Sequence, residues 1–377
     1  MIVMKILMLN YEYPPIGGGA ANACFYMLKE LAKYPDVQVD LVTSSPSNQF
    51  ETLEAGNKRI FRLNIHKKKL DHWTMPEISL WGVKAYEFAL DLAGKEHYDL
   101  CHCWFGWPSG LIGYRLKGKM PYIVALRGSD VPGYNARLSN LDRFVLKPVS
   151  RIVWRNASKV IANSEGLKNL ALKTLNCNIQ VIHNGVDLEE FKPAEEDELR
   201  KRQYKLRLIS TGRLIERKGY DSLIRALYQQ PRFELTLIGD GDQKYELWKL
   251  ARELDVQVKF LGRLDHRAIA VHLQAADVFV LASQGIESGI SLLEAMACGL
   301  PVIVTDVGGT RELVRQGYNG FICRKGSLDS LREALEKLNR KNITEMGRES
   351  RSIAEGFGWG RIVGEYMRVY RACIGGG

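Results

Sequence analysis

Short apolar runs alternate with segments of helical periodicity along the whole chain. Runs of about six apolar residues, bounded by turn residues, are typical of strands that are buried on both faces. The segment after the first run places Cys24, Leu28 and Leu31 at helical spacing. Strands that alternate with helices predict parallel sheets covered by helices on both faces. The predicted strands are 5–10, 37–43, 98–103, 122–127, 159–163 and 178–184, followed by 206–211, 235–240, 258–262, 278–283, 301–305 and 320–324.

The alternation is interrupted once, at residues 188–205, which are polar and charged and suit a linker with a surface segment. The sequence therefore predicts an α/β fold of two Rossmann-like, doubly wound parallel-sheet domains facing a cleft. The expected domains are 1–187 and 188–356, and an amphipathic helix over 357–377 is expected to pack back toward the first. Open parallel sheets bind ligands beyond the carboxyl ends of their strands, so we expect chemistry in the loops that follow strands.

Composition and charge change this picture little. The chain of 377 residues is 46% hydrophobic and 25% charged, as in soluble globular proteins. Without a signal-peptide pattern or an apolar run of about 18 residues, we expect a cytoplasmic protein. Seven cysteines form no CxxC pair and indicate neither a zinc site nor a disulfide framework. Of the net charge of +10, residues 1–187 carry +7, which suits solubility, anionic lipid or phosphorylated substrates.

The loop after the first strand, NYEYPPIGGGAAN at 10–22, carries three glycines where a helix is predicted to begin. Glycines at a helix N-terminus let backbone N–H groups approach an anion closely. The loop matches neither the Walker A pattern nor GxGxxG. A phosphate contact and a flexible connection are the two interpretations of this loop.

A second loop, STGRLIERKG at 210–219, places Arg213 and Lys218 between a strand and a helix. Cations are unfavourable at the positive end of a helix unless an anion binds there. Arginine offers a forked contact and lysine a point charge, a combination that suits a diphosphate. Two solvated surface cations are the alternative. The turn IGDGDQ at 238–243 favours a structural role, with its aspartates predicted to cap the next helix.

The third loop precedes a predicted helix at 289–298 and contains Glu287 and Glu294. Glu294 lies within a run of Leu, Ala and Met, where a carboxylate is unexpected unless it points to water or binds a ligand. Backbone amides at the start of this helix are suited to a phosphate. A glutamate inside the helix can accept hydrogen bonds from two vicinal hydroxyls, as on ribose.

These segments resemble the retaining glycosyltransferases of family 4, which have the GT-B fold. Similarity covers nearly the whole chain and is strongest from about residue 180 onward. The motif order is specific, whereas any single motif is not. The matching segments are YEYPPIGGGAAN, VIHNGVDLEEFKP, STGRLIERKG, LIGDGDQ, VKFLGRL, AADVFVLAS, SLLEAMACGLPVIVTDVGGTREL and NGFI.

The resemblance implies an N-terminal acceptor-binding domain and a C-terminal domain that binds a nucleotide sugar between the two. Arg213 and Lys218 would hold the diphosphate, Glu294 the ribose, and Gly18 or Gly19 would approach the diphosphate from the first domain. The backbone of residues 289–291, which are Gly289, Ile290 and Ser291, would meet phosphate or sugar. The leaving diphosphate would help to receive the acceptor's proton, and no metal or other cofactor is implied.

Two positions depart from the family pattern. The family spaces its glutamate pair E-x7-E, whereas six residues separate Glu287 from Glu294, and strict alignment puts Ile286 in the first position. Either the loop is one residue shorter and Glu287 still reaches the sugar, or that role has been lost or moved. The family often has a histidine where this chain has Arg127, which is no base at neutral pH. Arg127 would hold a phosphate or acidic acceptor, or be a structural partner of Asp130.

The predicted function is transfer of a sugar, with retention, from a UDP-, GDP- or ADP-linked donor to a glycan, lipid-linked or small-molecule acceptor. The candidate catalytic residues are Glu287, Arg127 and Asp130. Peripheral contact with an anionic membrane on the cytoplasmic face fits the basic first half, and no nucleic-acid partner is expected. A GT-B epimerase or phosphorylase and a non-catalytic nucleotide-sugar binder are the alternatives. An NAD-dependent oxidoreductase would need a complete GxGxxG, which the chain lacks.

Overall fold

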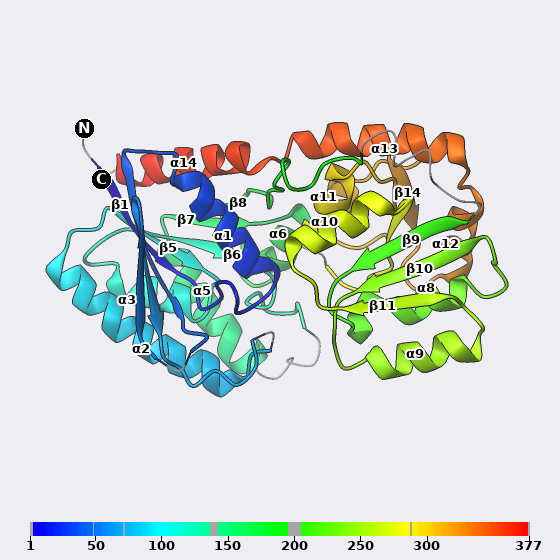
Figure 1. Cartoon of the computed structure of the whole chain (residues 1–377). Helices are drawn as coiled ribbons and strands as arrows, with labels where there is room; N and C mark the ends of the chain where they lie inside the picture. The colour runs from blue at the N-terminus through cyan, green and yellow to red at the C-terminus, as the bar shows by residue number, and fades with distance from the viewer. Residues whose placement is uncertain are drawn as a thin grey trace. The chain divides into compact units, whose positions relative to one another are not determined.

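The computed structural model describes residues 3–47, 49–70, 72–135, 142–194, 205–286 and 289–375. The chain forms two compact units (Figure 1). Unit 1 comprises Met1–Asn184 together with Trp359–Gly377, and unit 2 comprises Gly185–Gly358. Unit 2 is therefore a continuous segment, whereas unit 1 is assembled from both ends of the chain.

Over the described residues, unit 1 contains an eight-stranded sheet with the order β3-β4-β2-β1-β5-β6-β7-β8. Its neighbouring strands pair in parallel, except for the antiparallel pair β3 and β4. The prediction of a parallel sheet is confirmed, but it omitted β3 and β4. The strands are β1 Met4–Leu9, β2 Val37–Ser44, β3 Glu51–Ala55, β4 Lys58–Leu63, β5 Leu100–Trp104, β6 Tyr122–Leu126, β7 Lys159–Ala162 and β8 Ile179–Val181.

The helices of unit 1 form packed groups on its sheet. Helices α1 and α14 pack together, and α3 packs against both α2 and α5 (Figure 1). α14 lies at the end of the chain and also contacts β5. Along the described ranges, no helix has both the length and the apolar composition needed to cross a membrane. The helices are α1 Gly19–Leu31, α2 Met75–Lys95, α3 Ser109–Leu116, α5 Lys147–Asn156, α6 Glu165–Leu172 and α14 Trp359–Ile374, with a π-helical turn at Asp142–Leu146.

In the ranges that the structure describes, unit 2 contains a six-stranded parallel sheet with the order β11-β10-β9-β12-β13-β14. Its strands are β9 Leu206–Thr211, β10 Phe233–Ile238, β11 Val258–Gly262, β12 Val278–Leu281, β13 Val302–Thr305 and β14 Gly320–Cys323. Its helices are α8 Tyr220–Ala226, α9 Lys244–Glu253, α10 His266–Ala275, α11 Ile290–Ala297, α12 Leu328–Glu336 and α13 Arg340–Glu355, with 3-10 turns at Glu216–Lys218 and Thr310–Glu312.

Alternating side chains of the unit 2 strands enter two separate hydrophobic clusters. On β12, Val278 and Val280 belong to the cluster that includes residues of α8, α9 and α12. The residues between them along the strand, Phe279 and Leu281, belong to the cluster that includes residues of α10 and α11. Successive side chains of a strand point to opposite faces. The sheet is therefore covered by helices on both faces, as the apolar runs predict.

Each sheet has one position where the strand order reverses. In unit 2 the chain proceeds from β9 to β10 and β11 on one side, and β12 lies on the other side of β9. In unit 1 the corresponding position lies between β1 and β5. Open parallel sheets bind ligands just beyond the carboxyl ends of the strands at such a reversal. We therefore expect ligand-binding residues in the loops after β9, β12, β1 and β5.

Candidate active site

In unit 2 the loops that follow β9 and β12 pack directly on each other. The amide of Gln284 donates to the carbonyl of Arg217 at 2.7 Å. Gly219 has a φ of +65°, and a Cβ added there would lie 2.1 Å from the carbonyl oxygen of Ala282. A Cβ at Gly285 would lie 2.9 Å from Cδ of Arg217. Glycine is required at 219, where a backbone carbonyl leaves no room for a side chain, whereas at 285 the Arg217 side chain would have to shift.

The predicted diphosphate cations are brought to this reversal of strand order. Arg213 is exposed and Lys218 is half-buried. The Lys218 ammonium lies beside the start of the loop, since a Cβ added at Gly212 would be 3.6 Å from its Nζ. The two cations thus share one short loop between β9 and α8. Fixed at the end of the sheet, they offer positive charge to an anion.

The turn at 238–243 supports this loop from the other side. A Cβ at Gly239 would lie 1.9 Å from the carbonyl oxygen of Gly212. The amide of Leu214 donates to the carbonyl of Asp240 at 2.9 Å. The structural interpretation of this turn is supported by these contacts. Its predicted capping is wrong, because the N-cap residue of α9 is Gln243 and no side chain caps that helix.

Helix α11 begins where the sequence predicts, and its N-terminus faces the same end of the sheet. Gly289 is its N-cap residue with a φ of +75°, and no side chain caps the helix. Gly289, Ile290 and Ser291 are half-buried. Their amides are among the groups that a helix leaves without intrahelical partners, so they suit an anion. Glu287, the other glutamate of the pair, lies outside the described residues.

Glu294 does not point to water: it is only 6% exposed. Its Oε1 lies 3.5 Å from Nδ1 of His266, the first residue of α10. Burial, and secondarily the nearby Glu190 carboxylate, raise the pKa of Glu294 to about 8. Burial also lowers the pKa of His266, against the opposing effect of nearby carboxylates. Near neutral pH the pair is therefore a neutral carboxyl beside a neutral imidazole.

His266 was missed by the sequence prediction. In the sequence RLDHRAIA it reads as an ordinary first residue of a helix, and Asp265 before it is the N-cap. Its ring also meets the ring of Phe191 edge-on, with centroids 5.8 Å apart. Only the tertiary packing brings it to Glu294, so no local pattern could have indicated it.

In unit 1, Asp130 holds the loops after β5 and β6 together. Its carboxylate accepts hydrogen bonds from the backbone amides of Gly106 at 2.6 Å, Arg127 at 3.0 Å and Gly128 at 2.9 Å. It is 5% exposed. Burial raises the pKa of Asp130 although the three amides act in the opposite direction. Its contact with Arg127 is through the backbone and not through the guanidinium.

The guanidinium of Arg127 is held by three other groups. It lies over the Trp104 ring, 3.7 Å from the centroid. It donates to Oδ1 of Asn184 at 2.9 Å and to the hydroxyl of Tyr366, on α14, at 3.4 Å. Its Nε is buried and has no hydrogen-bond partner among the described residues. Arg127 is thus a fixed cation with an unused donor.

His102 is a buried residue of the β5 strand. It is fully buried, and burial, with the charge of Arg127, lowers its pKa well below the usual value. Its Nδ1 lies 2.8 Å from the hydroxyl of Tyr370. A buried imidazole held neutral in this way is no proton acceptor near neutral pH.

The glycine loop of unit 1 leaves the N-terminus of α1 uncovered. Gly18 is the N-cap residue, and no side chain caps the helix. Gly18 and Gly19 are both exposed, and a Cβ at Gly18 would meet nothing within 4 Å. Gly17 has a φ of +99°, and its amide donates to the carbonyl of Leu70 at 2.8 Å. The first amides of α1 are therefore accessible to an anion.

The described residues contain no group of three or more His, Cys, Asp and Glu side chains that could hold a metal ion. Within unit 2, the loops after β9 and β12 contribute two cations, the N-terminus of α11 and a buried carboxyl on that helix. This set can bind a diphosphate through charge and amides, and a diol through the carboxyl.

Comparison with known proteins gives a consistent result over nearly the whole chain. The family model described as glycosyl transferases group 1 matches residues 191–354, and that of glycosyltransferase family 4 matches residues 17–190. A Corynebacterium glutamicum GDP-mannose-dependent monoacylated alpha-(1-6)-phosphatidylinositol monomannoside mannosyltransferase is 34% identical, and the match covers 96% of each chain.

Solved structures show the same architecture. The structure of a sucrose-phosphate synthase from Thermosynechococcus elongatus has a TM-score of 0.87 at 23% identity, covering 99% of this chain and 100% of the other. Anabaena HepE, solved in complex with UDP and glucose, has a TM-score of 0.76 at 23% identity, covering 97% and 99%. These likenesses confirm the predicted GT-B fold.

Proposed function

Because the chain belongs to glycosyltransferase family 4 and is a glycosyltransferase of that type, we propose that it uses a nucleotide diphosphate sugar and transfers the sugar with retention. The acceptor is a sugar, a lipid-linked glycan or a small molecule. The supporting observation is the convergence of the Arg213–Lys218 loop and the loop that leads into α11 at the strand-order reversal of unit 2. The Anabaena structure holds UDP, and the C. glutamicum relative is named for GDP-mannose.

In this proposal unit 2 binds the nucleotide. Arg213 and Lys218 hold the diphosphate, and the amides of residues 289–291 meet phosphate or sugar. The Glu294 carboxyl binds the ribose hydroxyls, which explains why a core-facing position carries a glutamate. Its buried setting makes these hydrogen bonds stronger than they would be in water.

Unit 1 contributes an anion site and the groups near the acceptor. Gly18 and Gly19 give their amides to the diphosphate. Arg127 holds a phosphate or an acidic acceptor, because its guanidinium is fixed over Trp104 and is no base. Asp130 acts by fixing the loops after β5 and β6. Glu287 contacts the transferred sugar.

The leaving diphosphate helps to receive the proton of the attacking acceptor hydroxyl. The C–O bond to the diphosphate breaks as the acceptor oxygen bonds to the same face of the anomeric carbon. Arg213 and Lys218 stabilise the negative charge that develops on the diphosphate. This assignment accounts for retention without a protein base at Arg127.

The acceptor is proposed to lie at an anionic membrane surface on the cytoplasmic side. Residues 1–187 carry +7 of the net charge, which favours such a surface. The C. glutamicum relative is named for a phosphatidylinositol mannoside acceptor.

The first experiment tests a panel of UDP-, GDP- and ADP-sugars, with NAD as the control. It measures the shift in melting temperature and the release of nucleotide diphosphate for each compound. We expect one nucleotide sugar to raise the melting temperature and to be hydrolysed slowly without acceptor or metal. Release of the unchanged sugar with its anomeric configuration retained supports the transferase, whereas a sugar inverted at a ring carbon indicates an epimerase. Stabilisation by NAD alone would contradict the proposal.

The assignment of the diphosphate loop has its own test. Arg213→Ala and Lys218→Ala are each expected to lower kcat/KM by tenfold or more, since a charge-assisted contact to phosphate is lost. Lys249→Ala, at an exposed position of α9, is the matched control and should leave the rate unchanged. Equal rates in all three variants would remove this loop from the donor site.

A further inference from the structure

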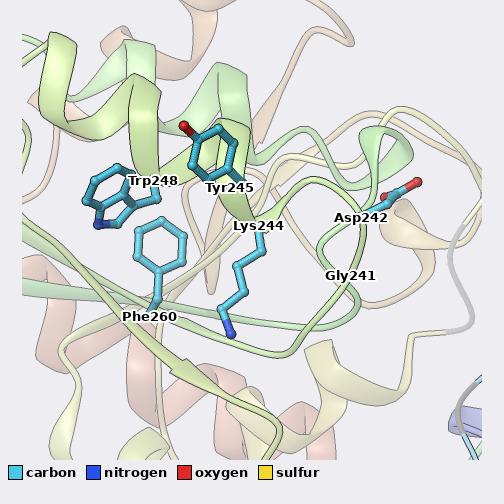
Figure 2. A pocket seen from close by; sticks show the side chains of 6 residues that line it. All are labelled: Gly241, Asp242, Lys244, Tyr245, Trp248 and Phe260. Atoms are coloured by element: carbon cyan, nitrogen blue, oxygen red, sulfur yellow. The ribbon is translucent and has the colours of Figure 1, made fainter.

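Unit 2 carries a hollow whose lining residues have no role in the proposed transfer chemistry. It has a volume of about 390 Å³ and is lined by Gly241, Asp242, Lys244, Tyr245, Trp248 and Phe260. Figure 2 shows the three aromatic rings gathered beside the start of α9, with Lys244 next to Phe260 and Asp242 further along the loop. Its volume falls within the range of about 300–1,000 Å³ typical of small-molecule sites. We call it the aromatic hollow.

Two of the three rings of the aromatic hollow are presented to solvent, while Phe260 is half-buried against the core. Tyr245 is 67% exposed and Trp248 is 44% exposed. Their ring planes are nearly parallel, with an interplanar angle of 27° and centroids 6.2 Å apart. Leu247 and Ala251, on the same helix, are buried and hold α9 on the sheet. The core therefore does not require the two aromatic residues at these positions.

The charges around the rings are balanced. Lys244 lies 3.6 Å from Asp240, and Lys249 lies 3.8 Å from Glu253. The guanidinium of Arg252 lies over the Trp248 ring at 4.8 Å. A surface that docks on an anionic membrane has an excess of lysine and arginine, which this one lacks. Balanced polar groups beside solvent-exposed aromatic rings suit a neutral ligand with an apolar face and many hydroxyls.

We propose that the aromatic hollow is a saccharide-binding site that is separate from the transfer site. The C–H groups on one face of a sugar ring pack on Trp248 and Tyr245. The Asp242 carboxylate accepts hydrogen bonds from its hydroxyls, and the Lys244 ammonium donates to them. A glycosyltransferase handles saccharides as reactants, so a bound glycan chain would remain near the enzyme between transfers.

The hollow is joined to the candidate donor loop by backbone contacts. The amide of Gln243 donates to the carbonyl of Leu214 at 3.0 Å. A Cβ at Gly241 would lie 2.4 Å from the same carbonyl oxygen. Because Leu214 follows Arg213, the backbone at the floor of the hollow packs directly on the backbone of the diphosphate loop. The side chains that line the hollow are not those proposed to hold the diphosphate. A saccharide in the hollow therefore lies within the donor-binding unit without occupying the donor site.

The test is direct binding to the full chain without any donor. The probes are maltotetraose, an α-1,6-linked mannotetraose and chitotetraose, measured by saturation-transfer NMR and by calorimetry up to about 20 mM, enough to fill a site with a Kd near 1 mM. We expect at least one of them to bind, and Trp248→Ala to weaken it about tenfold or more. Tyr228→Ala, at another exposed aromatic residue of unit 2, is the matched control and should bind as the parent does.

The outcomes separate this site from the proposed transfer function. Arg213→Ala should keep saccharide binding while losing the donor, and Trp248→Ala should keep transfer to a monosaccharide acceptor. Failure of every probe to bind, or binding that Trp248→Ala leaves unchanged, overturns the saccharide site. So does a Trp248-dependent dimer in light scattering, or Trp248-dependent binding to vesicles of phosphatidylglycerol and phosphatidylcholine, because the hollow would then serve a second copy or a lipid surface.

Discussion

Glu294 is a buried carboxyl whose position costs stability and for which we propose a role in ligand binding. Its neighbours are His266, Glu190 and Cys298, and none of them supplies a positive charge near neutral pH. Removing a carboxyl from water favours its neutral form. In the proposed function, hydrogen bonds to the hydroxyls of a bound ligand would compensate for this cost.

The stability of the protein should depend on pH through this residue. Its pKa is about 8 in the fold, against 4.5 for an unperturbed glutamate. Between these values the unfolded chain ionises Glu294 while the fold keeps it neutral, so the free energy of unfolding falls as pH rises from about 5 to 8. Glu294→Gln removes this dependence, and the variant should gain on the order of a few kcal/mol relative to the parent over that window.

Urea unfolding of both proteins at pH 5, 6, 7 and 8 measures the effect. The difference in the free energy of unfolding should grow with pH. A constant difference across the window would show that Glu294 ionises normally in the fold.

We predict that Asp130 contributes mainly to the stability of the fold and not directly to the chemical step. Asp130→Asn removes the charge that three backbone amides share, and one of its two acceptor oxygens becomes an amide donor. A loss of about 1–3 kcal/mol is expected, since buried amides lose their partner. Differential scanning calorimetry against Asp329→Asn, an exposed aspartate of unit 2, provides the comparison. A variant of unchanged stability but no activity would instead make Asp130 a catalytic residue.

At the scale of elements, the close packing of the loops after β9 and β12 explains why certain glycines are needed. Gly219 and Gly317 have similar positive φ values of +65° and +75°, but only Gly219 faces a neighbour, the carbonyl of Ala282. Gly317→Ala should cost about 1 kcal/mol from backbone strain alone. Gly219→Ala should cost clearly more and also weaken donor binding, because the loop must move.

Chemical denaturation of the two glycine variants, together with donor titration, checks this. The pair isolates the loop contact because both variants carry the same strain. Equal losses of stability, with donor binding intact, would mean that the loop accommodates the extra methyl group.

The strands of both sheets could be predicted from the sequence because buried parallel strands leave uninterrupted apolar runs. The segment LRLIST, at 206–211, coincides with β9. The hairpin of β3 and β4 was missed because β3 is polar and mostly exposed, so it leaves no such run, although Gly56-Asn57 marks its turn. Edge strands of this kind are defined by pairing and not by burial.

The candidate site could be predicted only in part, for a related reason. Arg213, Lys218 and Glu294 stand in local patterns, a strand end or an apolar helix, that make a charge conspicuous. The contact of His266 with Glu294, and those of Trp104 and Tyr366 with Arg127, join residues that are far apart in sequence. A single sequence contains no signal for such contacts.

At the scale of the whole molecule, the division of the chain predicts which parts fold alone. Unit 2 is the continuous segment 185–358, so we expect it to unfold cooperatively by itself. Residues 1–184 alone lack α14, whose buried Trp359, Tyr366 and Tyr370 belong to unit 1. That fragment should not unfold cooperatively.

A joined variant provides the control. The amide of Val186 donates to the carbonyl of Phe357 at 2.9 Å. The segments at which the chain enters and leaves unit 2 therefore lie side by side. Residues 1–184 linked to 359–377 by a short Gly-Ser segment should recover a cooperative transition in circular dichroism. A cooperative transition of 1–184 alone would show that α14 is dispensable to unit 1.

The pairing of Val186 with Phe357 and Gly358 also sets an order of events during synthesis. The sheet of unit 1 leaves the ribosome first, but its last helix is made only after all of unit 2. Once unit 2 has folded, it holds the two ends of the interrupted chain together, which removes most of the loop-closure entropy that α14 would otherwise face. The nascent chain is therefore expected to wait with the His102 side of its first sheet uncovered by α14, and apolar surface exposed during this interval favours aggregation.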